Sequence, residues 1–224
     1  MRILQIGLMK YSEALALMED IHSDIASDQN EEEAVLIVEH LPVVTMGLRD
    51  RSQDLKFTEE HLSQQGIDFV RIDRGGSVTV HEPGQLVLYP LLRIDARYLT
   101  VRRLVWALEE IMILECARWG IKAARDEVNP GIWFGQNKIG AVGIRIANHV
   151  SKHGLALNIF NNLETFSRII PCGIHGRGVA ALGALGLDVN SLEKKLPLIG
   201  LRMAADLKSI VENFRKPESN VSSS

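Results

Sequence analysis

The chain of 224 residues is poor in cysteine, with only Cys116 and Cys172. Two cysteines form no disulfide framework and supply too few thiolates for a structural zinc site. No apolar run approaches the roughly 20 residues that are needed to cross a bilayer. Acidic and basic residues nearly balance, with a formal net charge of −3. The composition therefore has no mark of a nucleic-acid-binding protein or a membrane-surface protein.

Several short motifs that bind cofactors are also missing. The chain has no GxxxxGK[ST] phosphate loop, no HExxH zinc motif and no CxxC pair. The glycines of GRGVAALG, residues 176–183, do not have the spacing of a dinucleotide-binding fingerprint. We therefore predict that the protein uses no metal, nucleotide or other cofactor.

The hydrophobic content of 46% is enough to bury a full core. We predict one domain over residues 1–215 and a disordered tail, KPESNVSSS, over residues 216–224. The first residues lack the apolar core and cleavage site of a secretory signal, and no arginine- and serine-rich leader precedes them. The predicted compartment is the cytoplasm.

The spacing of apolar residues predicts a helix over residues 11–26, a buried strand from Ala34 to His40 and a long helix after Thr100. Further stretches, including 131–146 and 153–159, resemble strands. Asn190 and Glu193 resemble a capping box that opens the last helix. Because the strands cluster between helices instead of alternating strictly with them, we predict an α+β fold with a mixed β-sheet core flanked by helices.

The segment RGGSVTVHEPGQ, residues 74–85, combines a strand with two special turns. The adjacent glycines allow a ligand to approach the backbone closely, and EPGQ fits a type II turn. One interpretation is a ligand loop in which Arg74 and His81 face the substrate. The other is a glycine-hinged hairpin with a solvated arginine.

A second pair of features points to chemistry at a thiol. Cys172 lies in IIPCGI between a rigid proline and a flexible glycine, whereas Cys116 lies on the apolar stripe of the long helix. Lys138 begins the glycine-containing strand NKIGAVGIRI. A lysine there is often only an exposed strand-end charge, but a desolvated lysine near a thiol lowers the thiol pKa from about 8.5 or accepts its proton. The pair predicts acyl transfer through a thioester on Cys172.

Taken in order, these segments resemble the lipoyl(octanoyl) transferases, which share a fold with the lipoate and biotin protein ligases. The resemblance covers nearly the whole chain, from GLMKYSEALAL through EHLPVVTMG, RGGSVTVHEPGQLVLYP, PGIWFGQNKIGAVGIRI and HGLALNI to IIPCGI. It implies that Cys172 is the nucleophile and that Lys138 lowers its pKa and transfers protons. It also implies a substrate channel lined by Arg74, Gly75, Gly76, Ser77, Val78, Thr79, Val80, His81, Ala141, Val142, Gly143, His153, Gly154, Leu155 and Ala156.

The resemblance implies particular partners as well. The donor is octanoyl-acyl carrier protein, and the acceptors are lysines of the lipoyl domains of 2-oxo acid dehydrogenase complexes and of the glycine cleavage H protein. No nucleic acid or membrane is expected as a partner. Because these proteins are typically acidic, four arginines are candidates for a docking surface: Arg49, Arg51, Arg71 and Arg74.

The chain departs from the family pattern at two places. Glu82 stands where the family commonly has glycine, and Ala180 and Ala181 replace hydroxyl residues after the cysteine loop. Glu82 is expected to add a carboxylate beside the channel entrance, and the alanines leave the cysteine loop without hydroxyl-mediated positioning. Two alternatives stay open: an ATP-dependent lipoate ligase of the same fold, and a catalytically silent module that binds acyl carriers or lipoyl domains.

Overall fold

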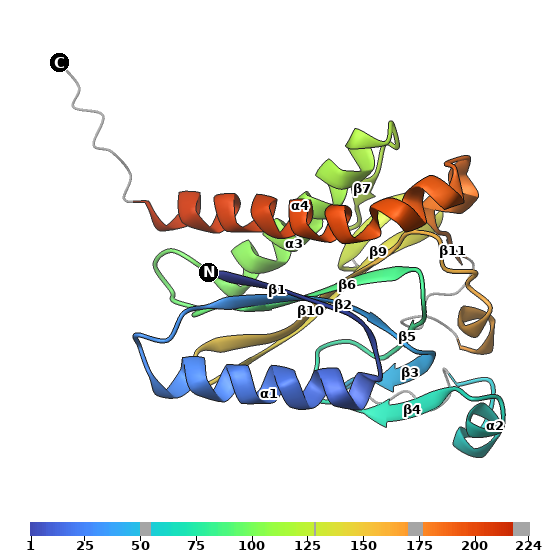
Figure 1. Ribbon diagram of the computed structural model, residues 1–224, viewed down its shortest axis with the longest axis horizontal. Helices are drawn as coiled ribbons and strands as arrows, with labels where there is room; N and C mark the ends of the chain where they lie inside the picture. Colours follow the sequence, from blue (N-terminus) through green and yellow to red (C-terminus); the bar gives the residue numbers. More distant parts are fainter. Residues whose placement is uncertain (50–54, 128, 170–176, 217–224) are drawn as a thin grey trace.

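The computed structural model describes residues 1–49, 55–127, 129–169 and 177–216. Within them, the main sheet has the strand order β1-β2-β6-β10-β9-β8-β7, and β11 pairs with β9 (Figure 1). The β1–β2 and β9–β11 pairs are parallel and the other pairs are antiparallel. The predicted mixed sheet is therefore confirmed. Its strands are β1 Arg2–Met9, β2 Ala34–His40, β6 Gln85–Leu91, β7 Ala124–Arg125, β8 Gly131–Phe134, β9 Asn137–Ala147, β10 Val150–Asn158 and β11 Gly178–Val179.

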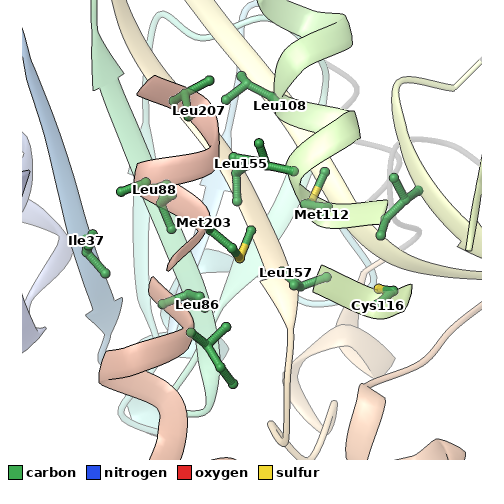
Figure 2. Close-up of a cluster of buried hydrophobic side chains, with 14 of the residues drawn as sticks. Ile37, Leu86, Leu88, Leu108, Met112, Cys116, Leu155, Leu157, Met203 and Leu207 are labelled. Carbon is green, nitrogen blue, oxygen red and sulfur yellow. The ribbon is translucent and has the colours of Figure 1, made fainter. Parts of the chain in front are cut away.

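Helices cover both faces of this sheet. Helix α1 (Tyr11–Ser27) packs on one face, whereas α3 (Val101–Arg118) and α4 (Val189–Arg215) pack on the other (Figure 1). Figure 2 shows side chains of the sheet pointing toward those of α3 and α4, with Leu88 and Leu155 among them. Complete burial of one such leucine contributes about 1.5–3 kcal/mol.

The helix starts follow local capping chemistry. The hydroxyl of Thr100 accepts a hydrogen bond from the amide of Arg103 at 3.2 Å, so the predicted N-cap of α3 is confirmed. The capping box predicted at Asn190 and Glu193 is wrong. Asp188 caps α4 instead, because its carboxylate accepts from the amide of Asn190 at 3.2 Å and the helix has already begun.

A smaller sheet, with the order β4-β3-β5, lies beside the main one (Figure 1). Its strands are β3 Val43–Met46, β4 Asp68–Arg71 and β5 Val78–His81, and the short helix α2 (Glu59–Gln64) packs against it. The turn from β5 to β6 has the predicted type II form: Gly84 has φ +87°, and the amide of Gln85 donates to the carbonyl of Glu82 at 3.1 Å. This turn joins the two sheets and leaves β5 facing β9 and β10.

In the described part of the chain no helix has the length and hydrophobicity required to span a membrane. Lys216 caps the end of α4. The rest of the predicted tail, residues 217–224, lies outside the described residues.

Two short 3₁₀ turns complete the described fold. The first, Thr165–Arg168, follows β10, and the second, Leu182–Leu185, follows β11. Leu182 of the second turn is buried in the core beneath α4. The burial of Leu182 holds the chain that leaves β11, and this contact helps to keep β11 next to β9.

Candidate active site

A cleft opens between the small sheet and strands β9 and β10, with about 500 Å³ of empty space that includes open solvent at its mouth. Twelve of the fifteen residues predicted to contact the substrate line it. They are Arg74, Gly75, Gly76, Thr79, His81, Ala141, Val142, Gly143, His153, Gly154, Leu155 and Ala156.

The other three predicted residues do not line the cleft. Val78 and Val80 are completely buried and pack with Val44 and Leu62 on the far side of β5. Successive strand residues point to opposite faces, so only Thr79 and His81 of this strand reach the cleft. Ser77 is buried just before the strand. The predicted run of eight contacting residues is therefore too broad.

Two lining residues, Tyr11 and Tyr89, were not predicted. The hydroxyl of Tyr89 lies 2.8 Å from Nε2 of His40, and the ring of Tyr11 stacks on His81 at 5.8 Å. Burial raises the pKa of Tyr11 to about 12 and lowers that of His40 to about 4. No sequence signal indicates this cluster, because Tyr11 has the spacing of a helix core position and Tyr89 lies within an apolar strand.

Arg74 links the segment before β5 to strand β3 at the wall of the cleft. Its Nη2 donates to the carbonyl and the hydroxyl of Thr45, both at 3.0 Å, and its Nη1 donates to the carbonyl of Gly75 at 2.9 Å. The residue is buried, so it does not belong to the predicted docking surface. Arg51 lies outside the described residues, and Arg71 pairs with Glu59 at 3.1 Å.

His81 is held in one tautomer by Gln85. The side-chain nitrogen of Gln85 donates to Val80 O and Asn158 Oδ1, so its oxygen accepts from Nδ1 of His81 at 2.7 Å. Burial lowers the pKa of His81 well below its ordinary value. The ring is therefore neutral at physiological pH, with Nδ1 protonated and Nε2 able to accept a hydrogen bond.

Lys138 reaches the cleft side of β9 because the strand has a bulge. Ile132 pairs with Gly140, but the next residue, Trp133, pairs with Lys138, which leaves Ile139 as the extra residue. Ile139 packs in the core under α3 and α4, on the same face that a side chain at Gly140 would meet. Strict alternation would have put Lys138 into that core, and the bulge turns it to the opposite face.

The surroundings of Lys138 connect it to the cleft. Lys138 is buried and lines a smaller hollow that shares Thr79, Ala141 and Ala156 with the cleft. The two hollows adjoin, and we call them the Lys138 end and the His153 end of one groove. Asn158 lines the Lys138 end and lies five residues beyond His153 on β10, so the groove follows the strand for about 17 Å.

A local break in strand pairing shapes the His153 end. The β6–β10 pairing runs from Gln85–Asn158 to Leu88–Leu155 and stops before His153, which has the left-handed φ of +58°. Its Nε2 lies 2.9 Å from a carboxylate oxygen of Asp73. Burial lowers the pKa of His153 and outweighs the hydrogen bond to Asp73, which raises it.

The two departures from the family pattern have structural explanations. Glu82 is not an exposed carboxylate at the entrance. It is buried, and one oxygen accepts from Asn161 Nδ2 and from the amide of Leu163, both at 3.0 Å. Ala180 is fixed through its backbone: its amide donates to Lys138 O at 3.0 Å, and its carbonyl accepts from Asn158 Nδ2 at 3.1 Å. Backbone contacts thus hold the segment after residues 170–176 against β9 without hydroxyl side chains.

The two cysteines differ as far as the structure describes them. Cys116 is fully buried in the core, and burial raises the pKa of its thiol to about 12. The predicted structural role of this cysteine is confirmed, because a thiol held protonated in the core is a poor nucleophile. Cys172, the predicted nucleophile, lies outside the described residues.

Comparisons with known proteins define the class. Residues 10–197 match the family model of the lipoyl protein ligase A/B catalytic domain. A structure of Ta0514 from T. acidophilum, described as a lipoate protein ligase candidate with bound lipoic acid, superposes with a TM-score of 0.67 at 14% identity. It covers 95% of this chain and 93% of its own. The fold is that of the lipoyl protein ligase A/B catalytic domain.

Closer relatives define the family within this class. An octanoyltransferase of Desulfotalea psychrophila is 39% identical over 208 residues, which cover 92% of each chain. A mitochondrial octanoyl-[acyl-carrier-protein]:protein N-octanoyltransferase of Danio rerio is 38% identical, covering 88% of this chain and 84% of its own. The chain belongs to the octanoyltransferase family, as its sequence motifs predicted.

Proposed function

We propose that this octanoyltransferase moves an octanoyl group from octanoyl-acyl carrier protein to a lysine of lipoyl domains through a thioester on Cys172. The expected acceptors are the lipoyl domains of 2-oxo acid dehydrogenase complexes and the glycine cleavage H protein. The observation that carries the proposal is the buried Lys138 at the end of a groove lined by small and apolar strand residues. The name of the Danio rerio relative supports the donor.

In the first step, the thiolate of Cys172 attacks the carbonyl carbon of the donor thioester. A carbon–sulfur bond forms to Cys172 and the bond to the carrier's thiol breaks. Lys138 takes the proton of the Cys172 thiol and returns it to the departing thiolate. The acyl chain lies along β9 and β10, where Ala141 and Ala156 present small side chains.

In the second step, the amine of the acceptor lysine attacks the acyl-enzyme. A carbon–nitrogen bond forms, the bond to Cys172 breaks, and Lys138 relays the proton lost by the amine to the thiolate of Cys172. The amide product is more stable than the thioester, so the transfer runs downhill without ATP.

The predicted compartment is the cytoplasm, whereas the name of the Danio rerio relative places that protein in mitochondria.

Intact-mass analysis after incubation with octanoyl-acyl carrier protein, without ATP, tests the proposal. We expect one octanoyl adduct that hydroxylamine removes and that peptide mapping assigns to Cys172. Cys172→Ala is expected to abolish adduct and transfer, whereas Cys116→Ala is expected to keep both. Transfer by the Cys172 variant, or transfer only with ATP and free octanoate, would overturn the proposal. Stable binding of the carrier without adduct or transfer would instead indicate a silent binding module.

A further inference from the structure

Trp133 is the cross-strand neighbour of Lys138. The bulge at Ile139 sets the register that pairs them, so both side chains lie on the same face of the sheet. The Nζ atom of Lys138 lies 5.6 Å from the centroid of the Trp133 ring, within the range of a cation–π contact. Trp133 is only 3% exposed, so water does not cover the ring.

A second cation contacts the same ring. The guanidinium of Arg177 lies 3.4 Å from the centroid of Trp133, and its Nη1 lies 2.6 Å from a carboxylate oxygen of Asp126. Arg177 directly precedes β11, whose Val179 pairs with Lys138. Asp126 balances the charge of Arg177, so two cations are able to share one aromatic ring without a net double positive charge.

The stem of the lysine is confined as well. A Cβ atom placed on Gly131 would lie 2.9 Å from Cε of Lys138 and 2.3 Å from the carbonyl oxygen of Gly140. The lysine side chain therefore passes directly over a residue that has no side chain. A long flexible amine that lies between Gly131 and the Trp133 ring loses much of its rotamer freedom before the substrate arrives.

We propose that Trp133 is a positioning residue for the transfer reaction: its ring holds the Lys138 ammonium, and the Arg177–Asp126 pair holds the ring. This inference rests on the proposed function, because it assigns Trp133 a role only through Lys138. Trp133 does not line the acyl groove. Its loss should therefore slow the proton transfers more than it weakens the binding of the donor.

Steady-state kinetics with octanoyl-acyl carrier protein and a lipoyl domain provide the test. Trp133→Leu keeps an apolar side chain but removes the aromatic face, and we expect kcat to fall about tenfold or more while KM for the donor stays within about twofold. Trp133→Phe keeps an aromatic face and is expected to restore kcat to within about threefold of the original. The matched control is Trp106→Leu, a change at a half-exposed tryptophan on α3, with kcat unchanged.

The outcomes separate this inference from the proposed function. If the unaltered protein transfers no octanoyl group, the proposed function fails first. If it is active and the Leu and Phe variants have equal kcat, or if only KM rises, Trp133 does not position Lys138. Should Trp133→Leu fail to fold, Arg177→Gln replaces it, because that side chain is 24% exposed. We expect a severalfold loss of kcat, and an unchanged kcat would overturn the role of the Arg177–Asp126 pair.

Discussion

The Lys138 end and the His153 end of the groove both lie on strands β9 and β10, but different contacts hold their polar side chains. At the Lys138 end, the lysine is placed by a strand bulge and by the aromatic ring of Trp133. At the His153 end, polar side chains bind one another, as in the His153–Asp73 and His40–Tyr89 hydrogen bonds. The first end places a lysine against an aromatic ring, whereas the second joins polar side chains to one another.

This difference matches what each end would do in acyl transfer. Burial lowers the pKa values of His40, His81 and His153, so these rings are neutral at physiological pH. Neutral rings are compatible with the apolar end of an acyl chain, and the guanidinium of Arg74, which also lines this end, is hydrogen-bonded to Thr45 and Gly75. Proton transfer instead requires an ionisable group at the reacting carbonyl. The groove thus separates an end with neutral histidines, which we call the neutral end, from a reactive end within two strands.

The largest effect is expected from removing the ionisable group of the reactive end. Lys138→Met keeps most of the side-chain length but removes the amine, and we expect kcat for octanoyl transfer to fall by about 10² to 10⁴, the usual contribution of a general acid–base group. The rate is measured by mass spectrometry of the octanoylated lipoyl domain.

A matched control is Lys122→Met, because this lysine is exposed and lies away from the groove. Its activity should stay within about twofold, as for most surface substitutions. A Lys138 variant that transfers as fast as the Lys122 variant would remove the functional contrast between the two ends.

The next effect concerns the neutral end and appears in stability. His40 has a folded pKa of about 4, below its ordinary value of 6.5, because burial disfavours the charged ring. The unfolded chain therefore binds more protons between these values, and the free energy of unfolding falls as the pH drops from 6.5 to 4. The loss is expected to reach about 3 kcal/mol and to be complete below the folded pKa.

Urea unfolding at several pH values between 7.5 and 4 measures this loss. In His40→Gln, the fall in the free energy of unfolding that is due to protonation of His40 should be absent. The carboxylates contribute equally to the pH dependence of both proteins. The variant also loses the bond to Tyr89, which lowers stability at every pH and is separable from the slope. Parallel pH profiles for the two proteins would mean that His40 is not held neutral.

The sequence predicted the elements whose signals are local. The Thr100 cap, the Glu82–Gln85 turn and the core position of Cys116 all follow from residue type and spacing, and the structure confirms them. Most of the residues around the cleft were also predicted, because they lie in the short motifs of the family.

The features that were missed depend on contacts between distant segments. The bulge at Ile139 reverses the alternation of β9, and the glycines of KIGAVG do not indicate at which residue it occurs. Tyr11 and Tyr89 meet only after α1 packs on β6. Glu82 was predicted to lie at the entrance, but its carboxylate is bound by Asn161 and by the amide of Leu163, about 80 residues further along the chain. Each case needs the tertiary arrangement, since no residue near in sequence supplies the partner.

The smallest effect tests how the neutral end obtains its shape. A Cβ atom on Gly154 would lie 2.0 Å from the carbonyl oxygen of Leu88 and 2.6 Å from Cδ of Pro90, both on the central strand β6. The backbone of a central strand has little freedom to move away. We expect Gly154→Ala to lower the free energy of unfolding by about 1–3 kcal/mol, the typical cost of overpacking a core.

Gly143→Ala is the matched control on the facing strand β9, because its nearest atoms would be Cδ of Arg74 and the carbonyl oxygen of Gly75, both at 3.2 Å. At 3.2 Å these contacts require a displacement of only a few tenths of an ångström, much less than the 2.0 Å contact at Gly154 requires. The expected order is therefore a larger loss of stability at Gly154 than at Gly143, measured by urea unfolding. An equal or reversed order would mean that the backbone of β6 moves as easily as the Arg74–Gly75 segment. The shape of the His153 end would then not depend on the close approach of β6 and β10 at Gly154.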